Sequence, residues 1–368
     1  IQMISFNSFK KHTQLHKKQI LDSIERVFDS QWYVLGKEVE AFEAKYSELS
    51  KVKNTIGVAS GLDALIIALK ALEIGRNDEV IVPSNTYIAT WLAVSAVGAK
   101  IIPVEPDLKT FNICPFSIEK VITNKTKGII PVHLYGQSCD MVAIMNIAKK
   151  HKLFVVEDNA QSQLATWNGK YTGSFGDINA TSFYPTKNLG AIGEAGAITT
   201  NINSLKDFVK SYRNYGSSEK YINKIKGVNS RIDELQAGIL NVKLNYLEEF
   251  TEERKQIAAR YYSNLGNLDE IELPYIRQEA VHVYHLFVIK SNKRDELAKF
   301  LLENKIQTGI HYPIPPHLQM AYSELGYNKG DFPISEKLSE TCLSLPLYPG
   351  LMNDEVDYIC EKIKLFYK

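Results

Sequence analysis

Short apolar runs alternate with longer amphipathic segments over the first two thirds of the chain. The short runs are rich in β-branched residues, which is typical of strands, and they cover residues 55–58, 79–82, 100–104, 128–133, 153–157, 178–183 and 196–200. Between them, apolar residues recur with helical spacing, as at Leu62, Leu65 and Leu69. This alternation predicts an α/β fold, with a mainly parallel sheet covered by helices.

The pattern changes at both ends of the chain. Residues 10–50 have a helical pattern that is broken by a turn near Gly36, and residues 233–265 form a long helical stretch that could leave the large domain. The remainder mixes helices with two or three strands, of which 281–289 has the clearest pattern. We therefore expect a large domain over 1–245 and a smaller α+β domain over 246–368. The N-terminal helices could pack on the small domain.

Composition narrows the class of protein. The 368 residues are 45% hydrophobic and 23% charged, as in a folded globular chain. Because 43 Lys and Arg nearly balance 42 Asp and Glu, a dedicated nucleic-acid binder is disfavoured. Without an 18-residue apolar run or a secretory signal, we expect a cytoplasmic enzyme with no membrane partner. His311 and His317, six positions apart with three prolines between them, do not have the spacing of a metal site.

Two segments have features of a ligand site at strand ends. In VASGLDA, a strand ends, Gly61 permits a tight turn and a helix begins, so backbone N–H groups and a helix dipole meet at a point that suits a phosphate. In LFVVEDNAQ, a buried strand leads into Glu157 and Asp158, which should point to opposite faces of the sheet. Alternatively, these segments are an ordinary turn and a capping acid.

Two further segments add an amine and a polar cluster. Lys187 follows a strand and is itself followed by glycines at 190, 193 and 196, which allow close approach of the backbone. Ser182 offers a hydroxyl just before it. The segment from Asn229 to Gln236 opens a long helix, and it could simply be a helix N-terminus capped by Asp233 or Ser230.

Together the four segments suit pyridoxal phosphate. The cofactor needs an amine that bonds to its aldehyde, an anion that keeps its ring nitrogen protonated, and a phosphate cradle. Lys187 would be the amine and Asp158 the anion. Lys187, once released by the substrate amine, would also move the proton between the substrate and the cofactor.

The same segments carry a resemblance to a known family. The motifs are YVLGKEVEAFE, VASGLDAL, PSNTYIAT, VHLYGQSCDM, VVEDNAQS, SFYPTKNLGAIGEAGA, NSRIDELQAGIL and GIHYPIPPHLQ. With them the chain resembles the DegT/StrS-type sugar-nucleotide aminotransferases. The resemblance implies the aspartate-aminotransferase fold, also called PLP fold type I, with a three-layer large domain and a seven-stranded sheet.

The resemblance also implies roles for individual residues. Lys187 is the implied Schiff-base lysine, Asp158 the partner of the ring nitrogen and Gln161 a contact of the ring hydroxyl. The other implied cofactor contacts are Ser60, Gly61, Leu62 and Ser182 at the phosphate, Tyr87 stacked on the ring, and Asn229 at the phosphate of a neighbouring subunit. The implied assembly is therefore a homodimer with shared active sites. Tyr87 has an alternative role, as a core tyrosine.

The implied substrates are a dTDP-linked sugar and L-glutamate. Tyr184 together with GIHYPIPPHLQ is similar to the branch that aminates the C3 ketone of a 6-deoxyhexose, which gives a 3-amino-3,6-dideoxyhexose for a surface polysaccharide or a glycosylated metabolite. The candidate substrate contacts are Tyr33, Tyr184, His311, Tyr312 and His317, each of which could instead be a packing residue. Amination at C4 is the alternative.

Three other functions fit the sequence less well. Sugar dehydratases of the same fold lack the lysine that is present here as Lys187. Amino-acid aminotransferases place an arginine near the carboxyl end, whereas the last arginine here is Arg294, and the partner of the glutamate carboxylate stays unnamed. A regulator would need a DNA-reading domain, and the 54 residues before the first expected strand show no helix-turn-helix pattern.

Overall fold

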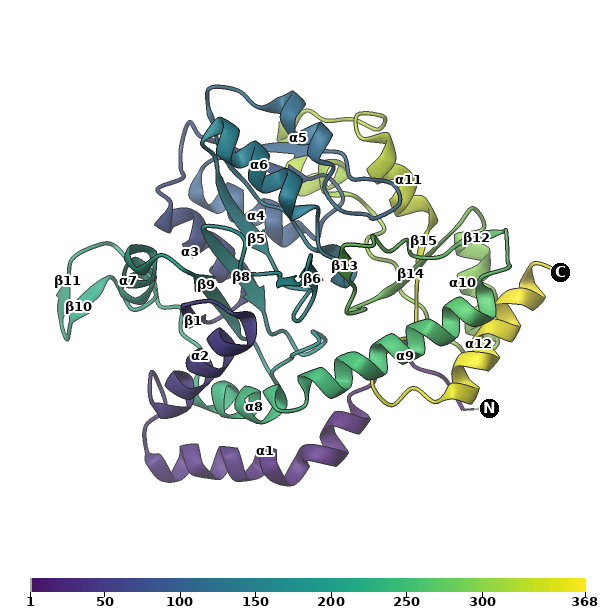
Figure 1. Ribbon diagram of the computed structural model, residues 1–368, viewed down its shortest axis with the longest axis horizontal. Coiled ribbons are helices and arrows are strands. Elements are labelled where there is room, and N and C mark those ends of the chain that lie inside the picture. The colour runs from purple at the N-terminus through teal and green to yellow at the C-terminus, as the bar shows by residue number, and fades with distance from the viewer. Residues whose placement is uncertain (1) are drawn as a thin grey trace.

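A seven-stranded sheet forms the centre of the larger part of the molecule, in the order β1-β9-β8-β5-β4-β2-β3. The computed structural model describes residues 2–368 (Figure 1). The strands are β1 (Asn54–Val58), β2 (Glu79–Pro83), β3 (Lys100–Val104), β4 (Thr126–Ile129), β5 (Phe154–Asp158), β8 (Ile178–Ser182) and β9 (Gly196–Thr200). Strand β9 runs antiparallel to both neighbours, β1 and β8, while the pairings among β8, β5, β4, β2 and β3 are parallel. The predicted mainly parallel sheet is confirmed.

Helices cover both faces of this sheet because side chains alternate along each strand. Val80 and Val82 pack in one core cluster, and Ile81 between them packs in another. The first face carries α3 (Gly61–Ala71), α4 (Ile88–Val97) and α7 (Asn203–Tyr212). The second carries α2 (Lys37–Ser50), α5 (Pro115–Val121), α6 (Met141–His151) and α8 (Glu234–Leu244). The result is the three-layer arrangement that was expected.

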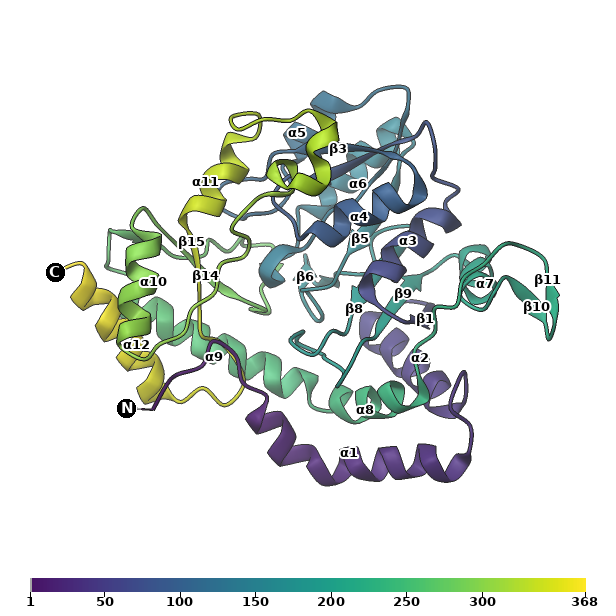
Figure 2. The same cartoon turned by 180° about the vertical axis from the view of Figure 1, so that it is seen from behind.

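The smaller part is built on the three-stranded sheet β12-β14-β15. Its elements are β12 (Ile271–Glu272), β14 (Phe287–Ser291), β15 (Cys342–Leu345), α9 (Leu247–Leu265), α10 (Arg294–Glu303) and α12 (Asn353–Phe366). Near the N-terminus, Ile4 bridges to Ile306 and is buried in this core, and α1 (Lys10–Ser30) then runs along α8 (Figure 2). The first residues therefore contact the small domain, and α1 contacts both α8 of the large domain and α9 of the small one, where Lys11 pairs with Glu253 at 2.6 Å.

The remaining elements are short or connect the two parts. They are β6 (Thr166–Trp167), β7 (Lys170–Tyr171), β10 (Ser217–Glu219), β11 (Ile222–Asn223), β13 (Ala280–Val281), α11 (Pro333–Thr341) and the 3-10 turns at Leu134–Gly136, Pro316–Leu318 and Met320–Leu325. Strand β13 pairs with β6 in a separate three-stranded sheet, β13-β6-β7, and Ser335 of α11 hydrogen-bonds Ser84 across 2.6 Å, so segments beyond residue 246 return to the larger part of the molecule. The division at 245/246 stays a prediction.

The expected strand at 281–289 is wrong in extent. It is divided into β13 and β14, because Tyr284 between them has a left-handed backbone with φ of 48°. The Arg254 guanidinium donates to the carbonyl oxygens of Tyr284 and His285, at 3.2 and 3.5 Å, where a strand would have paired them. The long helical stretch from 233 is likewise two helices, α8 and α9.

Candidate active site

A cavity of about 590 Å³ opens at the carboxyl ends of the parallel strands, within the usual size range of small-molecule sites. Both parts of the chain contribute to it, the small domain through His285, His311 and Tyr312. The predicted cofactor and substrate contacts that line it are Ser60, Gly61, Leu62, Tyr87, Asp158, Gln161, Ser182, Tyr184, Lys187, His311 and Tyr312. One cavity thus brings together eleven of the residues that were named from sequence.

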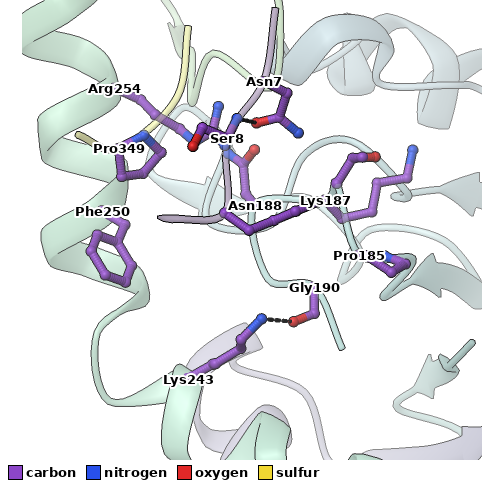
Figure 3. A pocket seen from close by; sticks show the side chains of 12 residues that line it. Asn7, Ser8, Pro185, Lys187, Asn188, Gly190, Lys243, Phe250, Arg254 and Pro349 are labelled. Atoms are coloured by element: carbon purple, nitrogen blue, oxygen red, sulfur yellow. Dashed lines mark hydrogen bonds between the residues drawn. The ribbon is translucent and has the colours of Figure 1, made fainter. Parts of the chain in front are cut away.

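Lys187 lies on a tight loop between β8 and β9. Its backbone N–H donates to the Tyr184 carbonyl at 2.8 Å, and a Cβ on Gly190 would meet the Pro185 oxygen at 2.3 Å, so the loop needs glycine there. Figure 3 shows the Lys187 side chain pointing away from Lys243 and Phe250, which lie behind the loop. Burial lowers the pKa of the Lys187 amine to about 8, against an opposing effect of Asp158. The amine is therefore a better nucleophile than an exposed lysine.

Asp158 ends β5 and faces the cavity. Its Oδ2 accepts a hydrogen bond from Thr90 Oγ1 at 2.9 Å, and its Oδ1 accepts one from the Ala160 N–H at 3.2 Å. Burial raises the pKa of this carboxyl above its usual value, while the Thr90 and Ala160 hydrogen bonds and the charge of Lys187 oppose the rise. A cation beside Asp158, such as a protonated ring nitrogen, would favour the carboxylate form further.

Glu157 faces the other side of the sheet, as the alternation along β5 predicted. Its carboxylate accepts backbone N–H groups of Gly173, Phe175 and Gly176, at 2.6 to 2.9 Å, and contacts His133 Nε2 at 2.8 Å. These bonds satisfy a carboxylate that is completely buried. Glu157 is therefore a structural residue, and Asp158 is left as the acid of the site.

The start of α3 forms a close-fitting concave backbone. Ser60 caps the helix, its Oγ accepting the Asp63 N–H at 3.1 Å. A Cβ on Gly61 would lie 2.5 Å from Ser182 Cβ, and one on Gly196 would lie 2.4 Å from the Ser60 backbone. Only glycine allows these approaches, and they bring the Ser182 hydroxyl beside the first backbone N–H groups of α3. This donor set fits a phosphate.

Aromatic and amide groups form the wall between the domains. Tyr87 is 54% exposed, and its ring lies 5.3 Å from that of Tyr312. Gln161 Nε2 donates to the Tyr312 hydroxyl at 3.1 Å, and its Oε1 accepts the Tyr135 N–H at 2.7 Å. Burial, and then the charge of Lys187, lowers the pKa of His311 to about 4, so its imidazole is neutral at pH 7. These residues can enclose a planar ring.

Three predicted residues do not line the cavity. His317 is 2% exposed and hydrogen-bonds Glu336 of α11 at 3.0 Å, so it packs against α11 and does not face the cavity. Tyr33 is exposed near the start of α2, where its carbonyl accepts the Glu234 N–H at 3.2 Å. Asn229 is also exposed and bridges to Asn214 at the base of the β10–β11 hairpin.

Four residues of the site were not predicted from the sequence. Three of them line the cavity, Thr86, Glu194 and His285, and the fourth, Thr90, hydrogen-bonds the Asp158 carboxylate. The available signal for the two threonines was their spacing of four in PSNTYIAT, on either side of the residue that caps α4, where their hydroxyls lie 2.9 Å apart. His285 and Glu194 gave no such signal, because only the tertiary fold brings their segments to the cavity.

The fold and the cavity define a class of protein: a three-layer α/β enzyme with a half-buried lysine, a buried carboxylate and a phosphate cradle in one site. The DegT/DnrJ/EryC1/StrS aminotransferase family matches residues 14–364. The chain belongs to this family. It is a transaminase, and its cofactor is pyridoxal phosphate.

Individual relatives are similar to this chain over nearly its whole length. The chain is 50% identical over 364 residues, 99% of both chains, to the dTDP-3-amino-3,6-dideoxy-alpha-D-galactopyranose transaminase of Aneurinibacillus thermoaerophilus. The crystal structure of DesV from S. venezuelae superposes with a TM-score of 0.98 at 40% identity, covering 100% of this chain and 99% of that one. NtdA from Bacillus subtilis, solved with bound cofactor PMP, gives a TM-score of 0.93 at 35% identity and covers 99% and 85%.

Within residues 2–368, no helix has the length and apolar character needed to cross a membrane.

Proposed function

We propose that the protein transfers the amino group of L-glutamate to C3 of a dTDP-linked 3-keto-6-deoxyhexose, giving a dTDP-3-amino-3,6-dideoxyhexose. The observation that carries this proposal is the full-length likeness, at 50% identity, to a transaminase whose name states that product class. Residues Tyr184, His311 and Tyr312 line the same cavity as Lys187, which supports a sugar bound there. We further propose that the reaction takes place in the cytoplasm.

The residues of the site can carry out both halves of such a reaction. Bound pyridoxal phosphate supplies an electron sink that stabilises negative charge at the carbon bearing the amino group. Asp158 would hold the proton on the ring nitrogen, and the start of α3 with Ser182 would bind the phosphate. Lys187 would move a proton from the α-carbon of glutamate to the aldehyde carbon of the cofactor, and in the second half-reaction it would move a proton from that carbon to C3 of the sugar. Tyr87 and Tyr312 would shield the reacting atoms from water.

The substrate is tested by product identification. The purified protein, loaded with pyridoxal phosphate, is incubated with L-glutamate and either a dTDP-3-keto or a dTDP-4-keto 6-deoxyhexose, and the products are analysed by mass spectrometry and NMR. We expect 3-amino product from the first sugar and turnover of the second to be lower by a hundredfold or more. Preferential formation of a 4-amino sugar would contradict the proposed substrate but not the transaminase activity.

We also propose that two chains form a homodimer with shared sites, in which Asn229 reaches the cofactor phosphate of the partner subunit. Asn229 lies outside the cavity of its own chain, at the base of a hairpin that projects from the body of the molecule (Figure 1). The hairpin exposes Tyr221 by 88% and its neighbour Ile222 by 51%. An exposed aromatic and aliphatic tip of this kind supports a contact with another chain.

Mixing two inactive variants tests this arrangement. Lys187→Ala and Asn229→Ala chains are each expected to be inactive alone. After dissociation and reassociation of an equal mixture, about a quarter of the wild-type activity should return, because half of the dimers are mixed and each holds one complete site. Two copies of the same variant treated alike are the control. Absence of recovery in verified mixed dimers would show that each chain completes its own site.

A further inference from the structure

Asp158 poses an electrostatic problem for the proposed function. It must be ionised to keep the ring nitrogen protonated, yet burial raises the pKa of its carboxyl. The Ala160 N–H, which is one of its hydrogen-bond donors, belongs to the backbone and is 3.2 Å away. The other donor is a side chain, Thr90 Oγ1, at the shorter distance of 2.9 Å. Hydrogen bonds to a carboxylate are stronger than those to a neutral acid, so this hydroxyl favours ionisation.

Thr90 does not act alone. Thr86 Oγ1 lies 2.9 Å from Thr90 Oγ1, and both threonines are at most 2% exposed. A hydroxyl has one proton, and an ionised Asp158 can only accept, so the Thr90 proton is then directed to Asp158 Oδ2. In the Thr86–Thr90 contact, Thr86 is then the donor. With Asp158 ionised, the hydrogen bonds run in one direction, from Thr86 to Thr90 to Asp158, and this arrangement favours the carboxylate.

The start of α4 holds these two hydrogen bonds in place. Tyr87 is the N-cap residue of α4, and the Thr90 N–H donates to the Tyr87 carbonyl at 3.2 Å. Thr86 precedes this N-cap residue and Thr90 lies in the first turn of α4, and their hydroxyls meet at 2.9 Å across the start of the helix. The same turn presents Tyr87 to the cavity, so a single short segment can contact the face of the ring and also the carboxylate at the ring nitrogen.

We infer that Thr90, supported by Thr86, is a positioning residue for the cofactor: its hydroxyl holds the Asp158 carboxylate ionised and turned toward the ring nitrogen. This inference rests on pyridoxal phosphate occupying the cavity. It does not depend on which sugar is aminated. The other groups that influence the charge of Asp158 are Lys187 on the loop after β8 and His133 after β4, and the tests below leave both unchanged.

The first test compares variants of the two threonines. Thr90→Val keeps the shape and removes the hydroxyl, Thr90→Ser keeps the hydroxyl, and Thr86→Val removes only the outer donor. The rate of the glutamate half-reaction is measured in single turnovers at saturating pyridoxal phosphate. We expect a loss of about tenfold to a hundredfold for Thr90→Val, as for a hydrogen bond to a charged group, about threefold for Thr86→Val, and less than threefold for Thr90→Ser.

A matched control removes a buried threonine hydroxyl elsewhere. Thr200, which is fully buried on β9, donates to the Asp177 carbonyl at 2.6 Å and does not line the cavity. Thr200→Val should lower the unfolding temperature by as much as Thr90→Val while it leaves the half-reaction rate unchanged. A Thr90→Val rate within threefold of the Thr200→Val rate would refute the inference.

The second test is a double-mutant cycle with Asp158→Asn. If Thr90 acts through the carboxylate, Thr90→Val should change the half-reaction rate by less than threefold once Asp158 is asparagine. An undiminished loss in the double variant would show that Thr90 acts by another route, and the inference would be wrong. Failure of the cofactor assignment would look different, because wild-type protein would then show no absorbance band of lysine-bound pyridoxal phosphate.

Discussion

Replacing Lys187 by alanine should abolish transamination and remove the yellow absorbance of the loaded enzyme. The physical reason is the loss of two functions at once, covalent attachment of the cofactor and transfer of the proton, so turnover should fall by about 10⁴-fold or more. Absorbance spectra before and after borohydride reduction, together with the rate of product formation, measure both. The wild-type band should be bleached by borohydride, and the variant should have no such band.

Lys187→Arg is the matched variant for charge. It keeps a cation at the same position but cannot form the covalent bond to the aldehyde. We expect it to resemble Lys187→Ala in both absorbance and rate. If Lys187→Arg retained the bleachable band, another amine would be the attachment point.

Replacing Asp158 by asparagine should lower turnover by about a hundredfold or more. Removal of one partner of a buried charge pair costs about 3–5 kcal/mol, and here the pair would be the carboxylate and the ring nitrogen. Asparagine is nearly the same size but carries no charge, so the ring nitrogen would lose its proton. Steady-state rates at saturating glutamate and cofactor measure the effect, while the yellow band should persist because Lys187 is intact.

Asp177→Asn is the control for this change. Asp177 lies at the opposite end of the sheet, and its Oδ2 accepts the Val155 N–H at 2.9 Å. An asparagine oxygen can accept the same bond, so turnover should stay within about twofold of wild type. Equal losses in the Asp177→Asn and Asp158→Asn variants would indicate a general effect on folding and would contradict the role given to Asp158.

The sequence pattern alone predicted those site residues whose position depends on a single strand or turn. The strand that ends at Asp158 could be predicted because a continuous apolar run leads into two acids, and the pleat then directs Glu157 and Asp158 to opposite faces. The turn at Gly61 could be predicted for a similar reason, since a strand, a glycine and an amphipathic helix follow one another. Lys187 followed from its position after a strand and before closely spaced glycines.

Contacts between distant segments could not be predicted in this way. His317 belongs to the same short motif as His311 and Tyr312, yet it lies in the 3-10 turn at Pro316–Leu318, where its buried ring hydrogen-bonds Glu336, a residue of α11. The strand expected at 281–289 is interrupted where Arg254, a buried arginine on α9 about thirty residues earlier, donates hydrogen bonds to the carbonyl oxygens of Tyr284 and His285. Neither effect leaves a periodic signal.

The most direct test of the central claim is to map the lysine that holds the cofactor. Two lysines compete, because burial lowers the pKa of both Lys187 and Lys243 to about 8. Lys243, however, lies behind the loop, where its Nζ donates to the Gly190 carbonyl at 2.6 Å (Figure 3). The loaded wild-type protein is reduced with borohydride and digested, and the modified peptide is located by mass spectrometry. The pyridoxyl label should be on Lys187, and a label on Lys243 or on any other lysine would contradict the account.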